Sequence, residues 1–189
     1  MSSRERIVEH SAELFRRQGY NGTGVKQIVA AASAPFGSIY HFFPGGKEQL
    51  GAEVIRSSGA LYLQLFVDIA AHAQDVPGAF ADFFDGAAQT LSETGFADAC
   101  PIATVALEVA STNETLRQAT AEVFESWIAA AAQFLAAAGI ERAAARALAL
   151  SILSLLEGAF IFSRSLRSTE PLHAAGASAV AAVRAALPA

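Results

Sequence analysis

The sequence predicts an all-α protein with nine helices, and three observations favour this fold class. Apolar residues make up 53% of the 189 positions, and alanine, the residue that favours helices most, is the commonest among them. Apolar positions recur every three or four residues, as on the buried face of a helix. No segment keeps the alternating pattern of a half-buried strand for long. We expect an N-terminal domain of three helices over residues 1–46 and a larger helical domain over 47–189.

The N-terminal segment predicts three helices with clear start and stop signals. The first covers residues 3–18, with a serine at position 2 or 3 as its cap and Gly19 at its end. The second covers residues 24–32, behind Thr23 as a possible N-cap. Residues 33 and 34 form a turn, and Pro35 suits the first position of a third helix that runs to residue 42 or 43. The PGG run at 44–46 ends that helix.

Six further helices are expected in the rest of the chain. The VPG run at 76–78 predicts a break, GFADACP at 95–101 predicts a loop, and Gly139 predicts another helix end. The predicted helices cover residues 47–74, 79–93, 102–110, 115–138, 141–167 and 171–187.

Charge and cysteine content limit the possible settings of the chain. Residues 1–56 hold seven Lys and Arg against five Asp and Glu, whereas residues 57–189 hold six against thirteen. A basic head on an acidic body fits nucleic-acid binding by the head alone. The single cysteine, Cys100, allows no intrachain disulfide. The N-terminus lacks a signal-peptide core, and the apolar uncharged run at 126–140 is shorter than the roughly 20 residues that span a bilayer. A cytoplasmic protein without a membrane contact is therefore expected.

Two short helices joined by a turn of small residues over 30–34 form the pattern of a helix-turn-helix, which lays its second helix in the major groove of DNA. Ile39 should point inward and Gly37 and Ser38 outward, while Tyr40 and His41 can reach phosphate oxygens. The alternative is a plain packing corner between helices. The residues expected at the DNA are Thr23, Lys26, Pro35, Phe36, Gly37, Ser38, Tyr40, His41 and Lys47, with the last at the free N–H groups of a helix start.

The run GTGVKQIVAAASAPFGSIYHFF resembles the N-terminal domain of the TetR family of bacterial repressors. PGGKEQL and CPIATVALEVA are similar to the subgroup of LmrA and YxaF, and LLEGAFIFSRS resembles the penultimate helix of TetR-type dimers. The resemblance implies a homodimer on a palindromic DNA operator and control of an efflux or detoxification gene. The family usually has a lysine where Phe36 stands. Phe36 either contacts a thymine methyl group or shields the helix pair.

The larger domain holds many aromatic residues, which favour either a cavity for a flat hydrophobic effector or an ordinary core. Phe80, Phe83 and Phe134 belong to this aromatic set. The residues expected to bind the effector are Phe66, Phe84, Phe96, Cys100, Phe124, Trp127 and Leu155.

The last two predicted helices are apolar over most of their surface, so each is buried either within the chain or against a second copy. We expect a dimer in which these helices form a four-helix bundle with their copies. The interface residues expected are Leu148, Ser151, Ile152, Leu155, Gly158, Ala159, Phe162, Val180, Val183 and Leu187.

An enzyme fits this sequence poorly. The four histidines lie on separate predicted helices without the spacing of metal ligands, and Cys100 has no base nearby in the sequence. No catalytic residue, metal or cofactor is therefore expected. A helical adaptor that binds only protein would leave the small turn and Tyr40 unexplained.

Overall fold

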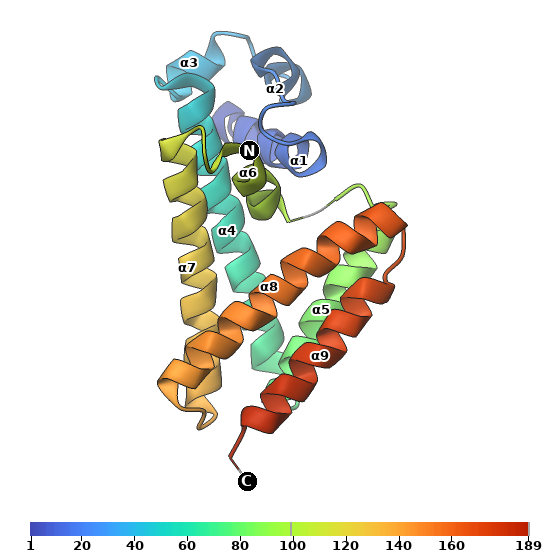
Figure 1. The fold of residues 1–189 in the computed structure, drawn as a ribbon. Helices are drawn as coiled ribbons and strands as arrows, with labels where there is room; N and C mark the ends of the chain where they lie inside the picture. The colour runs from blue at the N-terminus through green and yellow to red at the C-terminus, as the bar shows by residue number, and fades with distance from the viewer. Residues whose placement is uncertain (99, 189) are drawn as a thin grey trace. The chain divides into compact units, whose positions relative to one another are not determined.

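The computed structural model of the chain (Figure 1) describes residues 1–98 and 100–188. In this part of the chain the secondary structure consists of nine α-helices, and no strand is present. The helices are α1 Ser3–Gln18, α2 Val25–Ala31, α3 Ser38–Phe42, α4 Gly46–His72, α5 Val76–Glu93, α6 Pro101–Val109, α7 Glu114–Ala137, α8 Arg142–Leu166 and α9 Glu170–Ala186. The predicted fold class, helix number and helix order are confirmed.

The described residues form two compact units. Unit 1 consists of residues 1–61 and 100–124, and unit 2 consists of residues 62–98 and 125–188. Unit 1 therefore holds α6 and the start of α7 together with the first three helices. The predicted boundary after residue 46 separates a DNA-binding domain from a domain for effector binding and dimerisation. The two units are defined by packing alone, so this functional boundary stays a prediction.

Local signals explain where α1 begins and which face it buries. The Ser2 hydroxyl accepts from the Glu5 backbone N–H at 3.2 Å, and the Glu5 carboxylate accepts from the Ser2 N–H at 2.6 Å. This reciprocal pair is a capping box, which satisfies two of the free N–H groups at a helix start. Ile7 and Phe15, both at 0% exposure, then carry the buried face of α1 into the core of unit 1.

Helix α5 begins three residues earlier than expected. The VPG run was predicted to be a break, but Asp75 caps the helix and accepts from the Gly78 N–H at 2.6 Å. Pro77 lies in the first turn, where its missing N–H has no partner to lose. Proline here starts a helix, and the prediction of a break was wrong.

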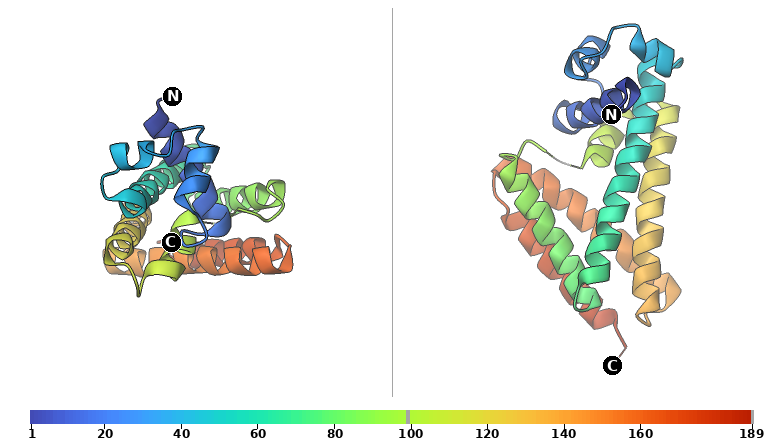
Figure 2. Two further views of the ribbon diagram at one scale, coloured as in Figure 1. Left: turned by 90° about the horizontal axis from the view of Figure 1, so that it is seen from above. Right: turned by 180° about the vertical axis from the view of Figure 1, so that it is seen from behind.

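Unit 2 is built around α9, which packs against both α5 and α8, as Figure 1 and the right-hand view of Figure 2 show. Phe84 of α5 is only 1% exposed. A Cβ at Gly176 of α9 would lie 2.8 Å from the Cβ of Phe84, so only glycine permits this close approach. Leu172 and Val183 of α9, both at 0% exposure, complete the packing along the same helix.

Two helices carry more apolar surface than this packing uses. Helices α4 and α8 are long and apolar enough to cross a membrane, with mean hydropathies of 1.2 and 1.7 over 18 residues, and only 22% and 28% of those windows are buried. Uncharged runs in the sequence did not reveal either helix, because each contains scattered charged residues. One or two such helices are weak evidence for a membrane protein, since core helices of soluble proteins pass the same test.

Candidate nucleic-acid interface

The turn between α2 and α3 has a defined hydrogen-bonded form. Ser33 adopts a left-handed conformation with φ at +48°. The Ala34 N–H donates to the Val29 carbonyl at 2.9 Å, and the Ser33 N–H donates to the Ala30 carbonyl at 3.2 Å. This is a Schellman motif, which normally has glycine at the left-handed position. The turn therefore fixes the direction of the chain that enters α3 at some cost in backbone strain.

The turn and α3 expose most of the residues predicted to meet DNA. Phe36 is 50% exposed and Tyr40 is 54% exposed, whereas Ile39 is fully buried as expected. Pro35, Gly37 and His41 are also exposed, and Ser38 is half-buried. A Cβ added at Gly37 would meet no atom within 4 Å, so this position faces open space. Lys26, on α2, is exposed as well.

The exposed aromatic side chains are ordered by contacts with one another. The Phe36 and Tyr40 rings are tilted, with centroids 6.1 Å apart. The His41 and Phe42 rings meet edge to face at 4.8 Å. The outer surface of α3 therefore offers apolar ring faces, one phenol hydroxyl and one imidazole, rather than a row of positive charges.

Thr23 is not available to DNA, and its prediction as a phosphate ligand was wrong. It is 1% exposed, and its hydroxyl donates to the Gly19 carbonyl at 2.7 Å while accepting from the Gln18 side-chain amide at 3.1 Å. The N-cap of α2 is Gly24, whose N–H donates to Gln27 Oε1 at 2.9 Å. The Thr23 side chain therefore stabilises the loop between α1 and α2 and does not bind a phosphate.

Lys47 is also directed inward rather than toward a phosphate. Its Nζ donates to the Tyr20 carbonyl at 2.7 Å and lies 4.0 Å from the centre of the Tyr20 ring. Burial lowers the pKa of the Lys47 ammonium, and the Glu108 carboxylate acts in the opposite direction. The expected phosphate contact is not made in this arrangement, because the ammonium joins α4 to the loop after α1.

Glu108, on α6, is a residue of this region that the sequence did not reveal. Its carboxylate accepts from the Asn21 backbone N–H at 2.8 Å, although 87 positions separate the two residues. A Cβ at Gly19 would overlap Glu108 Oε1, so glycine makes room for this contact. Glu108 and Lys47 thus hold residues 19–21 from two different helices.

The residues predicted for a dimer interface divide by burial. Ser151, Leu155 and Phe162 of α8 are exposed, and Leu148, Gly158, Val180 and Leu187 are half-buried. Ile152, Ala159 and Val183 are at most 6% exposed and lie in the core of unit 2. These last three have no surface to offer a partner, and their assignment to an interface was wrong. The prediction also missed exposed apolar residues of α8, namely Leu150, Ile161 and Leu166.

The residues predicted to bind an effector are divided between the two units. Phe66 lies among aromatic rings in unit 2, 5.6 Å from Phe83 and 5.9 Å from Phe134 between centroids. Trp127 lies edge to face with Tyr62 at 6.4 Å. Phe96 is half-buried against the same core as Phe66.

The four other members of the predicted effector set are Phe84 of unit 2, Cys100 and Phe124 of unit 1, and Leu155 of α8. Phe84 is 1% exposed, packs against Gly176 of α9, and lies in the core that Phe66 and Phe96 also contact, so its place in a cavity stays a prediction. Cys100 and Phe124 belong to unit 1, where Cys100 is the buried N-cap of α6. Leu155 lies on the exposed surface of α8. A cavity shared by the remaining residues stays a prediction.

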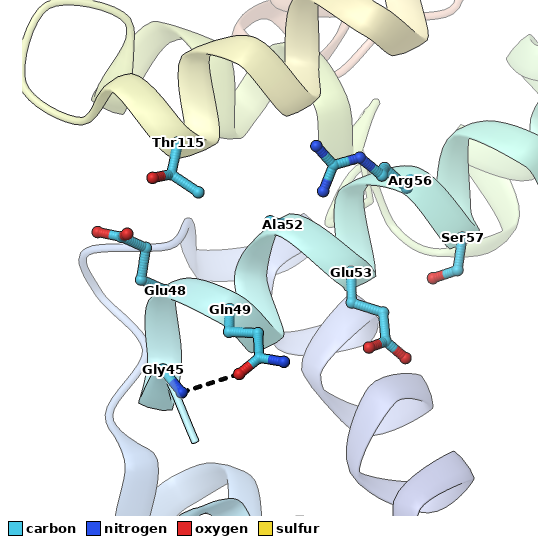
Figure 3. Close-up of a pocket in the computed structure, with 8 residues that line it drawn as sticks. All are labelled: Gly45, Glu48, Gln49, Ala52, Glu53, Arg56, Ser57 and Thr115. Carbon is cyan, nitrogen blue, oxygen red and sulfur yellow. Dashed lines mark hydrogen bonds between the residues drawn. The ribbon is translucent and has the colours of Figure 1, made fainter. Parts of the chain in front are cut away.

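A different hollow lies in unit 1, with a volume of about 520 Å³. Figure 3 shows its lining residues, most of which are polar and lie on the first turns of α4. Its charged groups already have partners within the protein, since Glu53 pairs with Arg4 at 2.6 Å and Arg56 pairs with Glu122 at 2.7 Å. The hollow is therefore not the apolar effector cavity that the sequence predicted. It is lined by Gly45, Glu48, Gln49, Ala52, Glu53, Arg56, Ser57 and Thr115.

The side chains that the structure describes contain no group of three or more His, Cys, Asp or Glu residues that could hold a metal ion. Around α3, the exposed groups are therefore those of a short helix with an apolar and aromatic outer face.

Comparisons with known proteins agree with this geometry. A family model for bacterial regulatory proteins of the tetR family matches residues 7–54. A second model, described as the C-terminal domain of LmrA/YxaF-like transcriptional regulators, matches residues 77–178. The chain is 35% identical over 170 residues to the uncharacterized HTH-type transcriptional regulator YxaF of Bacillus subtilis. The aligned residues cover 90% of this chain and 89% of YxaF.

A second relative and a solved structure support the same assignment. The HTH-type transcriptional regulator LmrA of Bacillus subtilis is 30% identical over 170 residues, covering 90% of each protein. A TetR transcriptional regulator from Legionella pneumophila has the same fold, with a TM-score of 0.86 at 22% identity over 100% of this chain and 98% of that one. The chain therefore belongs to the TetR family of DNA-binding transcriptional regulators, a family without enzymatic activity, and its C-terminal part is of the LmrA/YxaF-like type.

Proposed function

We propose that this regulator is a cytoplasmic repressor that binds a palindromic operator as a homodimer and leaves it when a small hydrophobic effector binds. The observation that carries this proposal is the exposed outer face of α3 in a helix-turn-helix whose inner residues are fully buried. An exposed face of this kind on a short helix suits insertion into the major groove, which admits one α-helix.

The contacts to DNA divide into two groups by chemistry. Pro35, Phe36, Gly37 and Ser38 precede or begin α3 and lie closest to the base edges. Tyr40 and His41 are exposed one turn later, where a phenol and an imidazole can donate to phosphate oxygens. These contacts position the helix, and Lys26 on α2 adds a positive charge beside them.

The homodimer rests on α8, whose exposed residues recur at helical spacing. Leu155 is 39% exposed, Phe162 is 63% exposed, and Ser151 and Gly158 lie on the same stripe. Large apolar residues alternate here with small ones, which lets a second helix approach closely. Covering this stripe would also account for the low burial of a helix with a mean hydropathy of 1.7. On α9, Val180 and Leu187 extend the surface.

The proposed effector is an apolar and aromatic compound. Phe66, Phe96 and Trp127 are each half-buried, so they have ring surface that the core does not fully cover. The effector can release DNA only if it binds the released conformation better than the DNA-bound one. We propose that it shifts α4, changes the spacing of the two α3 helices, and so derepresses an efflux or detoxification gene.

Selection of bound duplexes from a random pool, followed by electrophoretic mobility shift, tests this function. The expected result is a palindrome whose half-sites lie about one helical turn apart, roughly 34–36 Å. When a panel of hydrophobic aromatic compounds is added, at least one compound should release the protein from the DNA and abolish the shifted band. Binding that is equally strong to random and selected duplexes at physiological salt would contradict the proposal.

A further inference from the structure

Phe36 is an unusual residue to present to DNA. It lies at the entrance to α3, it is 50% exposed, and it packs on Tyr40 with ring centroids 6.1 Å apart. Exposed aromatic surface is unfavourable in water. The surface is therefore available to be covered when α3 enters its binding site.

Phe36 is not needed to close the core beneath it. Ile39 and Phe43 fill the interior of this corner at 0% exposure, and Ile28 of α2 is equally buried. Half of the Phe36 residue remains exposed after its contact with Tyr40. A role as a shield for the helix pair would require burial that the structure does not show.

The major groove offers few partners for an apolar ring. Guanine, cytosine and adenine present hydrogen-bond acceptors or donors there, and covering these with a phenyl ring leaves polar groups without partners. Thymine alone presents a methyl group, at C5. The neighbouring positions favour close approach, since a Cβ at Gly37 would face open space.

We propose that Phe36 is a specificity-determining residue that contacts the C5 methyl group of a thymine in each half-site of the operator. This inference rests on the proposed binding of α3 in the major groove. It identifies the base recognised at one position of each half-site, which the family assignment does not provide.

Replacement of thymine by deoxyuridine tests the contact directly, because it removes one methyl group and preserves base pairing. Each thymine of a selected operator is replaced in turn, and affinity is measured by mobility shift at fixed salt. At one position in each half-site the affinity should fall about fourfold, as expected for one buried methyl-sized group, and about 15-fold when both half-sites are changed. The other thymines should have little effect.

Variants of the protein show whether Phe36 is responsible. Phe36→Ala should bind the thymine and deoxyuridine operators equally well. Phe36→Lys should also lose the difference, and its affinity should depend more steeply on salt, by about one unit of log–log slope for each phosphate contacted. Leu107→Ala removes a residue of α6 that is 77% exposed, and it should keep the wild-type response to deoxyuridine.

The possible outcomes separate this inference from the proposed function. If the wild-type protein selects no sequence, operator binding itself is wrong. If it selects an operator but no deoxyuridine substitution weakens binding, the methyl contact is wrong and operator binding stands. A deoxyuridine effect that persists in Phe36→Ala would assign the methyl contact to another residue and overturn the role of Phe36.

Discussion

Removal of Phe162 should dissociate the proposed dimer without unfolding the subunit. Phe162 is 63% exposed on α8 and lies on the stripe with Leu155 and Leu166. Since an exposed residue contributes little to the fold of its own chain, Phe162→Ala should change subunit stability by less than about 0.5 kcal/mol. Its effect should appear only in association.

The size of the effect follows from the exposed surface. A phenylalanine side chain has an area of roughly 200 Å², so a partner could cover about 130 Å² of Phe162. At about 25 cal/mol for each Å², this corresponds to about 2–3 kcal/mol for each subunit after allowance for the remaining Cβ. A two-fold interface contains the residue twice, so Phe162→Ala should weaken the dimer by about 4–6 kcal/mol, or about 10³- to 10⁴-fold in Kd.

Sedimentation equilibrium over a range of protein concentrations measures this change, with circular dichroism to confirm that the helices are retained. Leu107→Ala is the matched control, because Leu107 is 77% exposed but lies on α6. It should leave association unchanged. A Phe162→Ala protein that dimerises at the same concentration as the wild type would refute the assignment of this surface.

Three further changes test the structure of unit 1. Ser33→Gly relieves a left-handed residue and should stabilise the protein by about 1 kcal/mol, raising Tm by about 2–4 °C. Glu108→Ala leaves the exposed Asn21 N–H without its acceptor at 2.8 Å, so it should lower the free energy of unfolding by about 0.5–1.5 kcal/mol and weaken operator binding. The pKa of Glu114 is lowered to about 2, chiefly by hydrogen bonds from Arg117, so its stabilising effect is present above its ordinary value of 4.5 and is lost as pH falls toward 2. Urea unfolding from pH 6 to pH 2 should show a smaller acid loss in Glu114→Gln.

Each of these changes has a result that would count against it. An unchanged or lower Tm in Ser33→Gly would mean that the turn is not strained, and Ala31→Gly, in the last turn of α2, is the control expected to destabilise. Wild-type unfolding and DNA affinity in Glu108→Ala would remove Glu108 from the support of the 19–21 loop. Identical acid profiles for Glu114→Gln and the wild type would show that this carboxylate is not linked to folding.

Local signals in the sequence predicted much of the fold. The bounds of α1 agree with the prediction at both ends, because a serine cap and a terminal glycine act on the neighbouring residues alone. The outward position of Gly37, the accessibility of Tyr40 and the burial of Ile39 were also predicted from the sequence. The start of α5 was missed because proline ends one helix and begins another, and only the Asp75 cap distinguishes the two cases.

Contacts with the loop after α1 explain the errors at the candidate site. Lys47 and Thr23 were assigned to phosphates by their positions near helix starts, but their side chains pair with backbone carbonyls of the loop after α1. The partner of Lys47 is 27 positions away, and that of Glu108 is 87 positions away. No periodic pattern in the sequence reports such pairs. On α8, apolar residues cover most of the helix, so the sequence alone did not separate the buried Ile152 from the exposed Phe162.

Dimethyl sulfate protection on a selected operator tests the central claim most directly. The reagent methylates guanine N7 in the major groove and adenine N3 in the minor groove, so it reports which groove a protein occupies. If α3 of each subunit lies in the major groove, guanine N7 should be protected in two patches about 10 base pairs apart on one face of the duplex. Protection of adenine N3 alone, or a single unpaired patch, would contradict binding by two α3 helices in successive major grooves.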